Sequence, residues 1–444
     1  MTETSHLKRL SELNSNTGIH FLTPAAQPGN HCPLYTAMRF AGGVDGLSTL
    51  LVGTPECSTY SRKNVARDSA GNGTLHWSYV LDSNDVVFGC HDGLIDAIIE
   101  MDKAGARAIL VAVTCVPELV GEDVGAILRE TKGRVSAKLA HVMLGNFKCI
   151  DTASGSWKSL EAMVDFMEPE AKQPDLINML GDDDGQATLP QALEKRGFRP
   201  RFIGQGASLG EYEAAPGAAL NIIVSTSAVQ MAGRMKKEFG TPYVDMCGLY
   251  APEDLRGAYA EIGEILGIEL QDEFDAKQAI LLQEDMREKL AGKTFILPSM
   301  RGGAGLALTA YLTELGMVPL LLDLSDFSAQ DKKWAARITQ KGVDPPVCHM
   351  INGEADSQVL AGFAPNFLLS AQRRGGRHGG QGGGSRHHGG QGGGNGRQGG
   401  SGGGSSADGM NGFPGYERTV SLLKYLENAA ARPAEPRQPG GRRR

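Results

Sequence analysis

Three cysteines, Cys32, Cys57 and Cys115, have a spacing that suits metal chemistry. Each has Pro or Gly close by, and Cys115 follows the apolar segment 108–113, which predicts a buried parallel strand. A cysteine at the carboxyl end of such a strand faces the crevice where open α/β sheets bind ligands. The gaps of 25 and 58 residues differ from the close cysteine pairs of zinc sites. Widely spaced loop cysteines can instead converge on one iron–sulfur cluster, and three buried free thiols are the alternative.

The elements that must position these cysteines alternate between strand and helix. A βαβ alternation predicts a parallel sheet with helices on its faces. The helix after Cys32 would point its N-terminus at the cysteine loop, where its amides and dipole favour an anionic cluster. Residues 1–20 are predicted to form a polar helix. The other elements expected in this unit are helices at 33–40 and 94–103 and strands at 47–52, 108–113 and 135–144.

Two further units repeat this pattern, so we predict an α/β fold of three Rossmann-like domains with parallel sheets. The domains are expected at 1–160 with the cysteines, at 161–290, and at 291–372 together with 407–430. A Gly-rich turn at 301–305 is expected to be structural rather than a nucleotide site. The expected strands are 176–180, 201–203, 221–224, 294–297 and 318–324, and the expected helices are 189–196, 228–239, 253–266, 306–315 and 420–428.

Composition limits the class of protein. The 444 residues can bury two or three cores, and the chain lacks an apolar run of membrane-spanning length. The N-terminus shows no apolar signal segment, so we expect a cytoplasmic protein with reduced thiols. The whole chain has a net charge of −7. Residues 373–444 carry +8, so residues 1–372 carry −15. An acidic body argues against DNA as the main partner.

A low-complexity segment interrupts the third unit. Residues 373–406 consist almost entirely of Gly, Arg, Gln, His and Ser, and they repeat His-Gly-Gly-Gln-Gly-Gly-Gly at 378–384 and 388–394. This composition has no apolar residue to bury, so it predicts a flexible insert. The residues from 431 to 444 are predicted to be a disordered basic tail. An Arg-Gly-Gly sequence at 374–376 raises RNA binding as an alternative, although the insert has no aromatic residue for base stacking.

The motifs around the cysteines resemble component 1 of nitrogenase and its relatives. Residues 85–89 resemble the family's Val-Phe-Gly-Gly turn, and residues 113–124 resemble its Thr-Thr-Cys-x-x-Glu-x-Ile-Gly-Asp-Asp segment. Residues 53–62 look like its His-Gly-x-x-Gly-Cys-x-x-x-x-Arg loop. The resemblance covers about residues 22–428, and the cysteine spacing is similar to that of the K-type (β) subunit.

The resemblance implies a site shared between two chains. It implies that Cys32, Cys57 and Cys115 are metal ligands, one subunit's share of a P-cluster-type iron–sulfur centre. It also implies a homologous D-type (α) partner in an α2β2 heterotetramer and an ATP-dependent iron–sulfur reductase of the H type. Ser225 stands where D-type chains have their cofactor cysteine, so we expect the catalytic cofactor on the partner and no catalytic residue here. Cys90 follows the 85–89 turn, and it is either close to the cluster or a structural thiol.

Departures from the family pattern leave several functions open. Cys32-Pro33 replaces Cys-Gln-Pro, and the loop at 141–146 replaces the Ser-Phe-Val-Gly-Ser-like loop of K-type nitrogenase chains. These departures favour a nitrogenase-like relative over an enzyme that reduces dinitrogen. The full K-type cysteine set resembles that of the methylthio-alkane reductases, which implies an oxidoreductase that relays electrons to the partner's cofactor and cleaves carbon–sulfur bonds of small methylthio compounds. The alternatives are a NifN-like scaffold for cofactor assembly and a nitrogenase β subunit that reduces dinitrogen.

Overall fold

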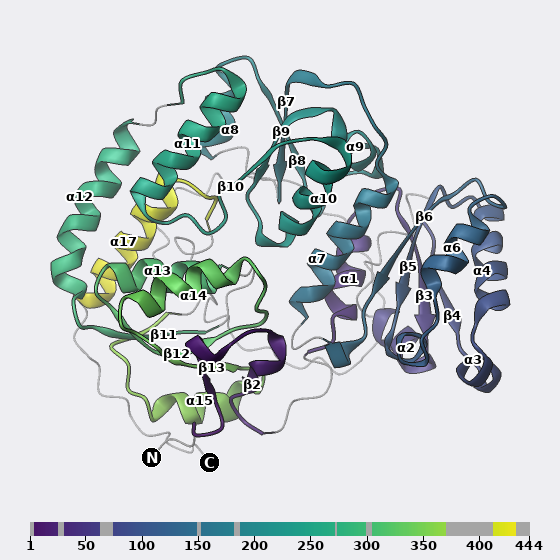
Figure 1. The fold of residues 1–444 in the computed structure, drawn as a ribbon, viewed down its shortest axis with the longest axis horizontal. Coiled ribbons are helices and arrows are strands. Elements are labelled where there is room, and N and C mark those ends of the chain that lie inside the picture. Colours follow the sequence, from purple (N-terminus) through teal and green to yellow (C-terminus); the bar gives the residue numbers. More distant parts are fainter. Residues whose placement is uncertain are drawn as a thin grey trace, which may run out of the picture.

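The computed structural model describes residues 4–24, 31–62, 74–148, 152–181, 187–270, 273–298, 304–369 and 412–431. Three sheets lie around a common centre, each with helices packed on it, and we refer to them as three lobes (Figure 1). All strand pairs within the sheets are parallel except β1 (Lys8–Arg9) with β13 (Pro346–His349). This arrangement confirms the predicted α/β class with parallel sheets.

The first lobe contains the three cysteines of the sequence prediction. Its two central strands, β3 and β5, are buried at every position, and most of their residues are apolar, as is typical of parallel strands covered on both faces. The order in the sheet is β4-β3-β5-β6. Its strands are β3 (Ser48–Gly53), β4 (His76–Val80), β5 (Ala108–Val113) and β6 (Lys138–Met143), and its helices are α1 (Leu34–Ala41), α2 (Pro55–Arg62), α3 (Ser83–Phe88), α4 (His91–Lys103), α5 (Cys115–Val120), α6 (Val124–Thr131) and α7 (Ala153–Ala162).

The second lobe has a sheet of order β10-β9-β7-β8. It shares one apolar core with the first lobe, in which the rings of Phe40 and Tyr212 pack edge to face at 6.3 Å. The two lobes are therefore joined by buried side chains. The strands are β7 (Gln173–Leu180), β8 (Arg199–Ile203), β9 (Ala218–Ile223) and β10 (Tyr243–Asp245), and the helices are α8 (Thr188–Glu194), α9 (Leu209–Glu213), α10 (Val229–Phe239), α11 (Pro252–Leu266) and α12 (Glu273–Leu290).

The third lobe has a sheet of order β1-β13-β12-β11-β14, with β2 also paired to β13. The last helix, α17, adds Tyr416 to the core of the second lobe and Leu423 to that of the third, so it ties the two lobes together. The remaining elements are β2 (His20–Phe21), β11 (Thr294–Leu297), β12 (Val318–Asp323), β14 (Phe367–Leu368), α13 (Gly305–Glu314), α14 (Asp331–Gln340), α15 (Gly353–Ala361) and α17 (Tyr416–Ala430).

The prediction of a polar helix over residues 1–20 is wrong. Two short strands and two 3-10 turns occupy this region, and both strands pair with β13 of the third sheet. Leu10 and Ile19 are buried in the third lobe's core. Backbone pairing along β13 and the burial of these side chains outweigh the local helical tendency. The N-terminal residues thus join the third sheet, while the domain boundaries drawn from the sequence stay a prediction.

Several sequence predictions fall outside the described residues. These are the Gly-rich insert at 373–406, most of the turn at 301–305, and the tail except Ala431. Within the described part of the chain, no helix combines the length and the apolar character that crossing a membrane requires.

Candidate functional site

Cys57 and Cys115 lie at the same edge of the first sheet. Strands β3 and β5 are parallel neighbours with Val52 opposite Val113, and each is followed by a helix that begins near a cysteine. Cys115 is the first residue of α5, and Cys57 lies in the first turn of α2. The expectation of loop cysteines is therefore corrected for both. The positive end of a helix dipole favours negative charge, so this placement suits a thiolate.

Cys32 approaches the same edge from a different element. It lies just before α1, whose predicted N-terminus at the cysteine segment is confirmed. Helix α1 packs against α2, and Cys32, Cys57 and Tyr60 are partly buried against one apolar core. Burial raises the pKa of the Tyr60 hydroxyl, and the charges of Cys32 and Tyr35 add to this shift.

Asn146 is the polar neighbour of Cys115. Its backbone N–H donates to Cys115 Sγ over 3.3 Å, and the thiol lies 3.2 Å from Asn146 Oδ1, to which it donates. Burial raises the pKa of the Cys115 thiol, the hydrogen bond from Asn146 opposes that rise, and the charges of Cys57 and Glu118 add to it. The register of β3 and β5 places the segments that carry Cys57 and Cys115 side by side. Cys57 also has a polar neighbour, because the Thr54 hydroxyl donates to Cys57 Sγ over 3.7 Å.

The donor set fits a shared cluster better than a single ion. Within the described ranges, no three His, Cys, Asp or Glu residues are arranged to hold one metal ion. The three cysteines supply soft sulfur donors that are half-buried at one edge, as iron–sulfur clusters require. The residues therefore fit part of a cluster shell, and other ligands would have to complete it.

Cys90 does not lie among these donors. It is only 1% exposed and packs in the core on the other face of the first sheet. Its backbone N–H donates to Glu122 Oε2 over 2.7 Å. Burial and the Glu122 carboxylate raise the pKa of the Cys90 thiol to about 12. A protonated, buried thiol is a structural group, so these features favour the structural alternative for Cys90.

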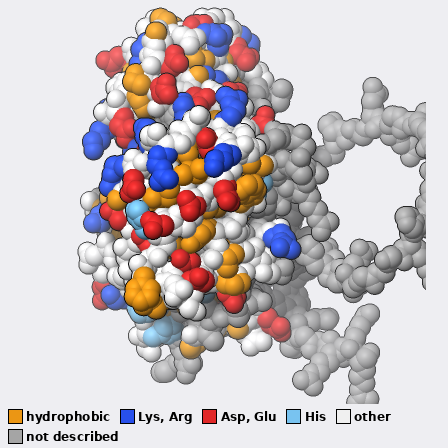
Figure 2. All heavy atoms as spheres, turned by 90° about the vertical axis from the view of Figure 1, so that its right-hand side faces the viewer, with side chains coloured by type: hydrophobic (Ala, Val, Ile, Leu, Met, Phe, Trp, Pro, Cys, Tyr) orange, Lys and Arg blue, Asp and Glu red, His pale blue; other side chains and the backbone are white. Residues whose placement is uncertain are grey.

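Exposed apolar side chains surround the edge that carries Cys115. Phe88 is 84% exposed and Leu119 is 64% exposed, and helices α3 and α5 that carry them contact each other. Figure 2 looks onto this side of the molecule and shows hydrophobic side chains gathered among charged ones. Exposed apolar side chains that gather in this way mark interaction sites. We call this surface the apolar rim, and its members are Val86, Val87, Phe88, Leu119, Val120 and Phe147.

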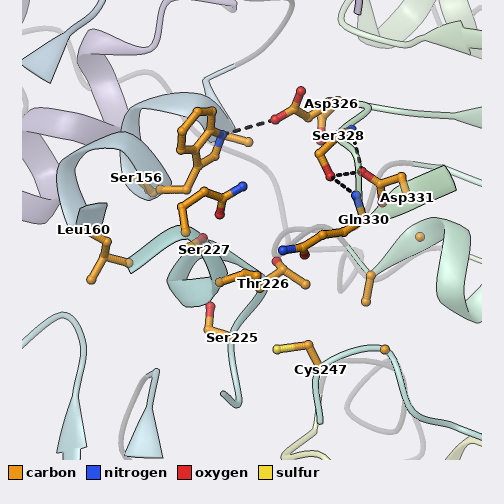
Figure 3. Close-up of a pocket in the computed structure, with 18 of the residues that line it drawn as sticks. Ser156, Leu160, Ser225, Thr226, Ser227, Cys247, Asp326, Ser328, Gln330 and Asp331 are labelled. Carbon is orange, nitrogen blue, oxygen red and sulfur yellow. Dashed lines mark hydrogen bonds between the residues drawn. The ribbon is translucent and has the colours of Figure 1, made fainter. Parts of the chain in front are cut away.

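A second candidate site is a cavity of about 470 Å³ that is lined by residues of all three lobes. It lies beyond the carboxyl ends of β9, β10 and β12, where open parallel sheets bind ligands. Ser225 and Cys247 face it from the segments that follow the neighbouring strands β9 and β10 (Figure 3). Because Ile223 pairs with Asp245, these two residues stand at equivalent places, two positions beyond their strands.

Hydrogen bonds hold the cavity wall in place. Trp157 Nε1 donates to Asp326 Oδ2 over 3.1 Å and so links the first lobe to the third (Figure 3). Ser328 donates to Asp331 Oδ2 from its backbone N–H at 2.8 Å and from its hydroxyl at 2.7 Å. Burial raises the pKa of the Asp331 carboxyl, although the Ser328 donors oppose this. The Cys247 thiol donates to the Ile223 carbonyl over 3.6 Å.

Sequence reasoning identified the three cysteines but missed Asn146 and the place of Cys247. Cys247 is buried, and burial holds the pKa of its thiol well above the usual range. Its position beside Ser225 follows from the register of β9 and β10. A cysteine just after a strand of a predicted parallel sheet was the signal that could have found it.

Comparisons with known proteins agree on one family. A family model described as nitrogenase component 1 type oxidoreductase matches residues 32–378. The nitrogenase iron-molybdenum cofactor biosynthesis protein NifE of a Nostoc species is 27% identical over 374 residues, which are 78% of this chain and 76% of that protein. NifE of Methanococcus maripaludis is 24% identical over 316 residues, which are 66% of this chain and 64% of that protein.

Two more distant relatives extend this result. The nitrogenase molybdenum-iron protein alpha chain of Methanosarcina barkeri is 25% identical over 276 residues, so the match spans 57% of this chain and about half, 52%, of that one. A solved structure described as nitrogenase Cp1 at pH 6.5 superposes with a TM-score of 0.65 at 15% identity, covering 91% of this chain and 93% of the other. This likeness shows the fold.

Proposed function

Because the chain belongs to the family of nitrogenase component 1 type oxidoreductases, we propose that it is a scaffold subunit on which a metal–sulfur cofactor is assembled. The observation that carries the proposal is the place of Cys57 and Cys115 at one edge of the first sheet, next to an exposed apolar rim, with Cys32 just before α1, which packs against α2. The similarity to NifE proteins, which are cofactor biosynthesis proteins, supports assembly rather than substrate reduction.

The three cysteines would hold an iron–sulfur cluster of the P-cluster type. When bound, such a cluster supplies one-electron chemistry at a potential set by its ligands and their surroundings. The thiolates of this chain would bind the irons, and the partial burial of Cys115 would limit access of water. The N–H of Asn146 would donate to a ligating sulfur.

A homologous partner subunit would complete the shell. Three cysteines are an incomplete set, and the apolar rim lies beside them, so one partner surface could cover the rim and supply the missing ligands. Two such pairs would form an α2β2 heterotetramer with twofold symmetry.

The cavity between the lobes offers a place for cofactor under assembly. Its volume of about 470 Å³ is in the range of ligand pockets. Cys247 lines it beside Ser225, and its buried thiol would have to give up its proton and its hydrogen bond to the Ile223 carbonyl to act as a soft ligand. A cofactor held here during assembly departs from the expectation based on Ser225, under which the catalytic cofactor belongs to the partner.

Cofactor transfer tests the proposal. The chain would be purified without oxygen together with its co-expressed homologous partner and mixed with a cofactor-free component 1 protein. We expect metal–sulfur cofactor to pass to the acceptor and to activate it. The matched control is the same complex carrying Cys115→Ala. No transfer by a complex that does contain the cofactor contradicts the scaffold function.

The second candidate is the K-type subunit of a nitrogenase-like reductase, which the complete set of three cysteines favours. It would relay electrons from an ATP-dependent iron–sulfur reductase to a cofactor on the D-type partner, with reductive cleavage of methylthio compounds as the reaction. The relatives named above do not support the K-type assignment or this substrate. If the complex released methanethiol from a methylthio compound, or ammonia from dinitrogen, in an ATP-dependent reaction, this candidate would be favoured over the scaffold.

A further inference from the structure

The turn that contacts Cys115 is itself held by the helix on which Cys115 lies. Strands β5 and β6 are parallel neighbours, and Leu144 N donates to the Val113 carbonyl over 2.8 Å. Gly145 and Asn146 therefore follow β6 at the level where Cys115 follows β5. One helical turn after Cys115, Glu118 accepts a hydrogen bond at Oε2 from Gly145 N over 2.7 Å.

The packing at Gly145 leaves no room for a side chain. A Cβ on this residue would lie 2.6 Å from Glu118 Oε2 and 2.6 Å from the ring of Phe147. A side chain at this position would therefore have to displace the Glu118 carboxylate or the Phe147 ring, and so would disturb the hydrogen bond from the Gly145 amide to Glu118. The Glu118 contact thus fixes the backbone of the turn just before Asn146.

Glu118 has a second route to the sulfur besides its charge. Its Oε2 accepts from Gly145 N over 2.7 Å, and the next backbone N–H, that of Asn146, donates to Cys115 Sγ over 3.3 Å. Two consecutive amides of one turn thus connect the carboxylate to the sulfur.

We propose that Glu118 is a positioning residue, which holds the Gly145–Asn146 turn so that the Asn146 N–H donates to the sulfur of Cys115 when that sulfur ligates the cluster. The inference rests on the proposed cluster ligation. Asn146 contacts the Cys115 sulfur twice, through its backbone N–H and through Oδ1, which accepts from the thiol. N–H donors to ligand sulfur make a cluster easier to reduce.

The test is the midpoint reduction potential of the bound cluster, followed by EPR in the complex with the partner. Glu118→Ala removes the acceptor, so the amide loses its orientation and the potential falls. Glu118→Gln keeps an acceptor oxygen and removes a negative charge, so the potential stays or rises. The matched control is Glu122→Ala on the same segment, because Glu122 accepts from Cys90 N and not from the Asn146 turn. A rise in both Glu118 variants overturns the proposal, since charge alone would explain it.

If the Glu118→Ala variant binds no cluster, its reduction potential cannot be measured, so a second measurement is made on the metal-free chain. In the metal-free chain, hydrogen–deuterium exchange at residues 144–147 should accelerate in Glu118→Ala and stay slow in Glu118→Gln. Equal protection in the two variants overturns the positioning role. A wild-type complex that binds no cluster refutes the proposed function, whereas a wild-type cluster with an unshifted Glu118→Ala potential refutes this inference alone.

Discussion

Gly155 and Pro33 lie in direct contact, with no space for a side chain between them. A Cβ on Gly155 would overlap the carbonyl oxygen of Pro33 and lie 2.5 Å from Thr36 Oγ1. Gly155 belongs to α7, and Pro33 caps α1 immediately after Cys32. The backbone of Cys32 is thereby supported by a helix more than a hundred residues further along the chain.

Gly155→Ala is expected to destabilise the chain by about 2 kcal/mol, because overfilled cores force helices apart. It should also weaken binding of iron, since α1 must move and Cys32 moves with it. Urea unfolding and iron analysis measure the two effects. Gly257→Ala in α11 is the control, because its added Cβ meets nothing within 4 Å and alanine is the better helix former by about 1 kcal/mol. An unchanged Gly155→Ala variant would contradict the close packing.

Replacement of a ligand thiol should remove the cluster. Cys57→Ala and Cys115→Ala each delete a sulfur donor from the same edge, so we expect a loss of bound iron and sulfide from the anaerobic complex. Cys90→Ala is the control, since this thiol is buried away from the cysteine edge. Wild-type iron content in both ligand variants would refute the assignment of Cys57 and Cys115.

The apolar rim should control assembly with the partner. Phe88→Ser and Leu119→Ser each replace an apolar side chain by a hydroxyl that the interface would bury away from water. The complex should therefore bind its partner more weakly and dissociate at protein concentrations at which the wild-type complex stays intact. Size-exclusion chromatography with light scattering measures this. Leu281→Ser is the matched control, because Leu281 is 67% exposed on α12, outside the rim. Equal weakening by the control would show that the rim is not the interface.

Cys90 should make stability depend on pH in the alkaline range. The thiol has a pKa of about 12 in the folded chain, against roughly 8.5 when unfolded. The unfolded chain therefore loses this proton first, and stability falls as the pH rises above about 8.5. Between pH 8 and 10 the wild type should lose about 2 kcal/mol more than Cys90→Ala in reducing urea titrations. Parallel curves for both chains would refute the raised pKa.

Cys247 should affect cofactor capture without affecting the cluster. Cys247→Ala removes the thiol that lines the cavity, so transferable cofactor should fall while iron at the cysteine edge stays constant. Gln230→Ala, at the same cavity, is the control for a change in shape without loss of sulfur. Loss of both metal pools in Cys247→Ala would instead indicate unfolding, which a melting curve reveals.

Local sequence was sufficient for many elements of the fold. The apolar runs at 108–113 and 294–297 are strands with the predicted bounds, because short buried parallel strands need continuous apolar residues. The predicted helix 228–239 corresponds to α10, which ends before Gly240 in the left-handed region at φ 69°, where glycine is favoured. The sequence also placed Cys115 at the carboxyl end of a strand.

Only the tertiary structure decided which distant residues meet. The contact of Asn146 with Cys115 depends on the register of β5 and β6. The place of Cys247 and Ser225 at one cavity depends on the register of β9 and β10. The pairing of β1 and β2 with β13 overrode the local helical tendency of the first residues. The hydrophobic periodicity and the turn residues of a segment indicate only its own secondary structure and which of its residues are buried. Strand register and the packing of three lobes around one cavity arise from contacts between segments, and a local pattern does not encode them.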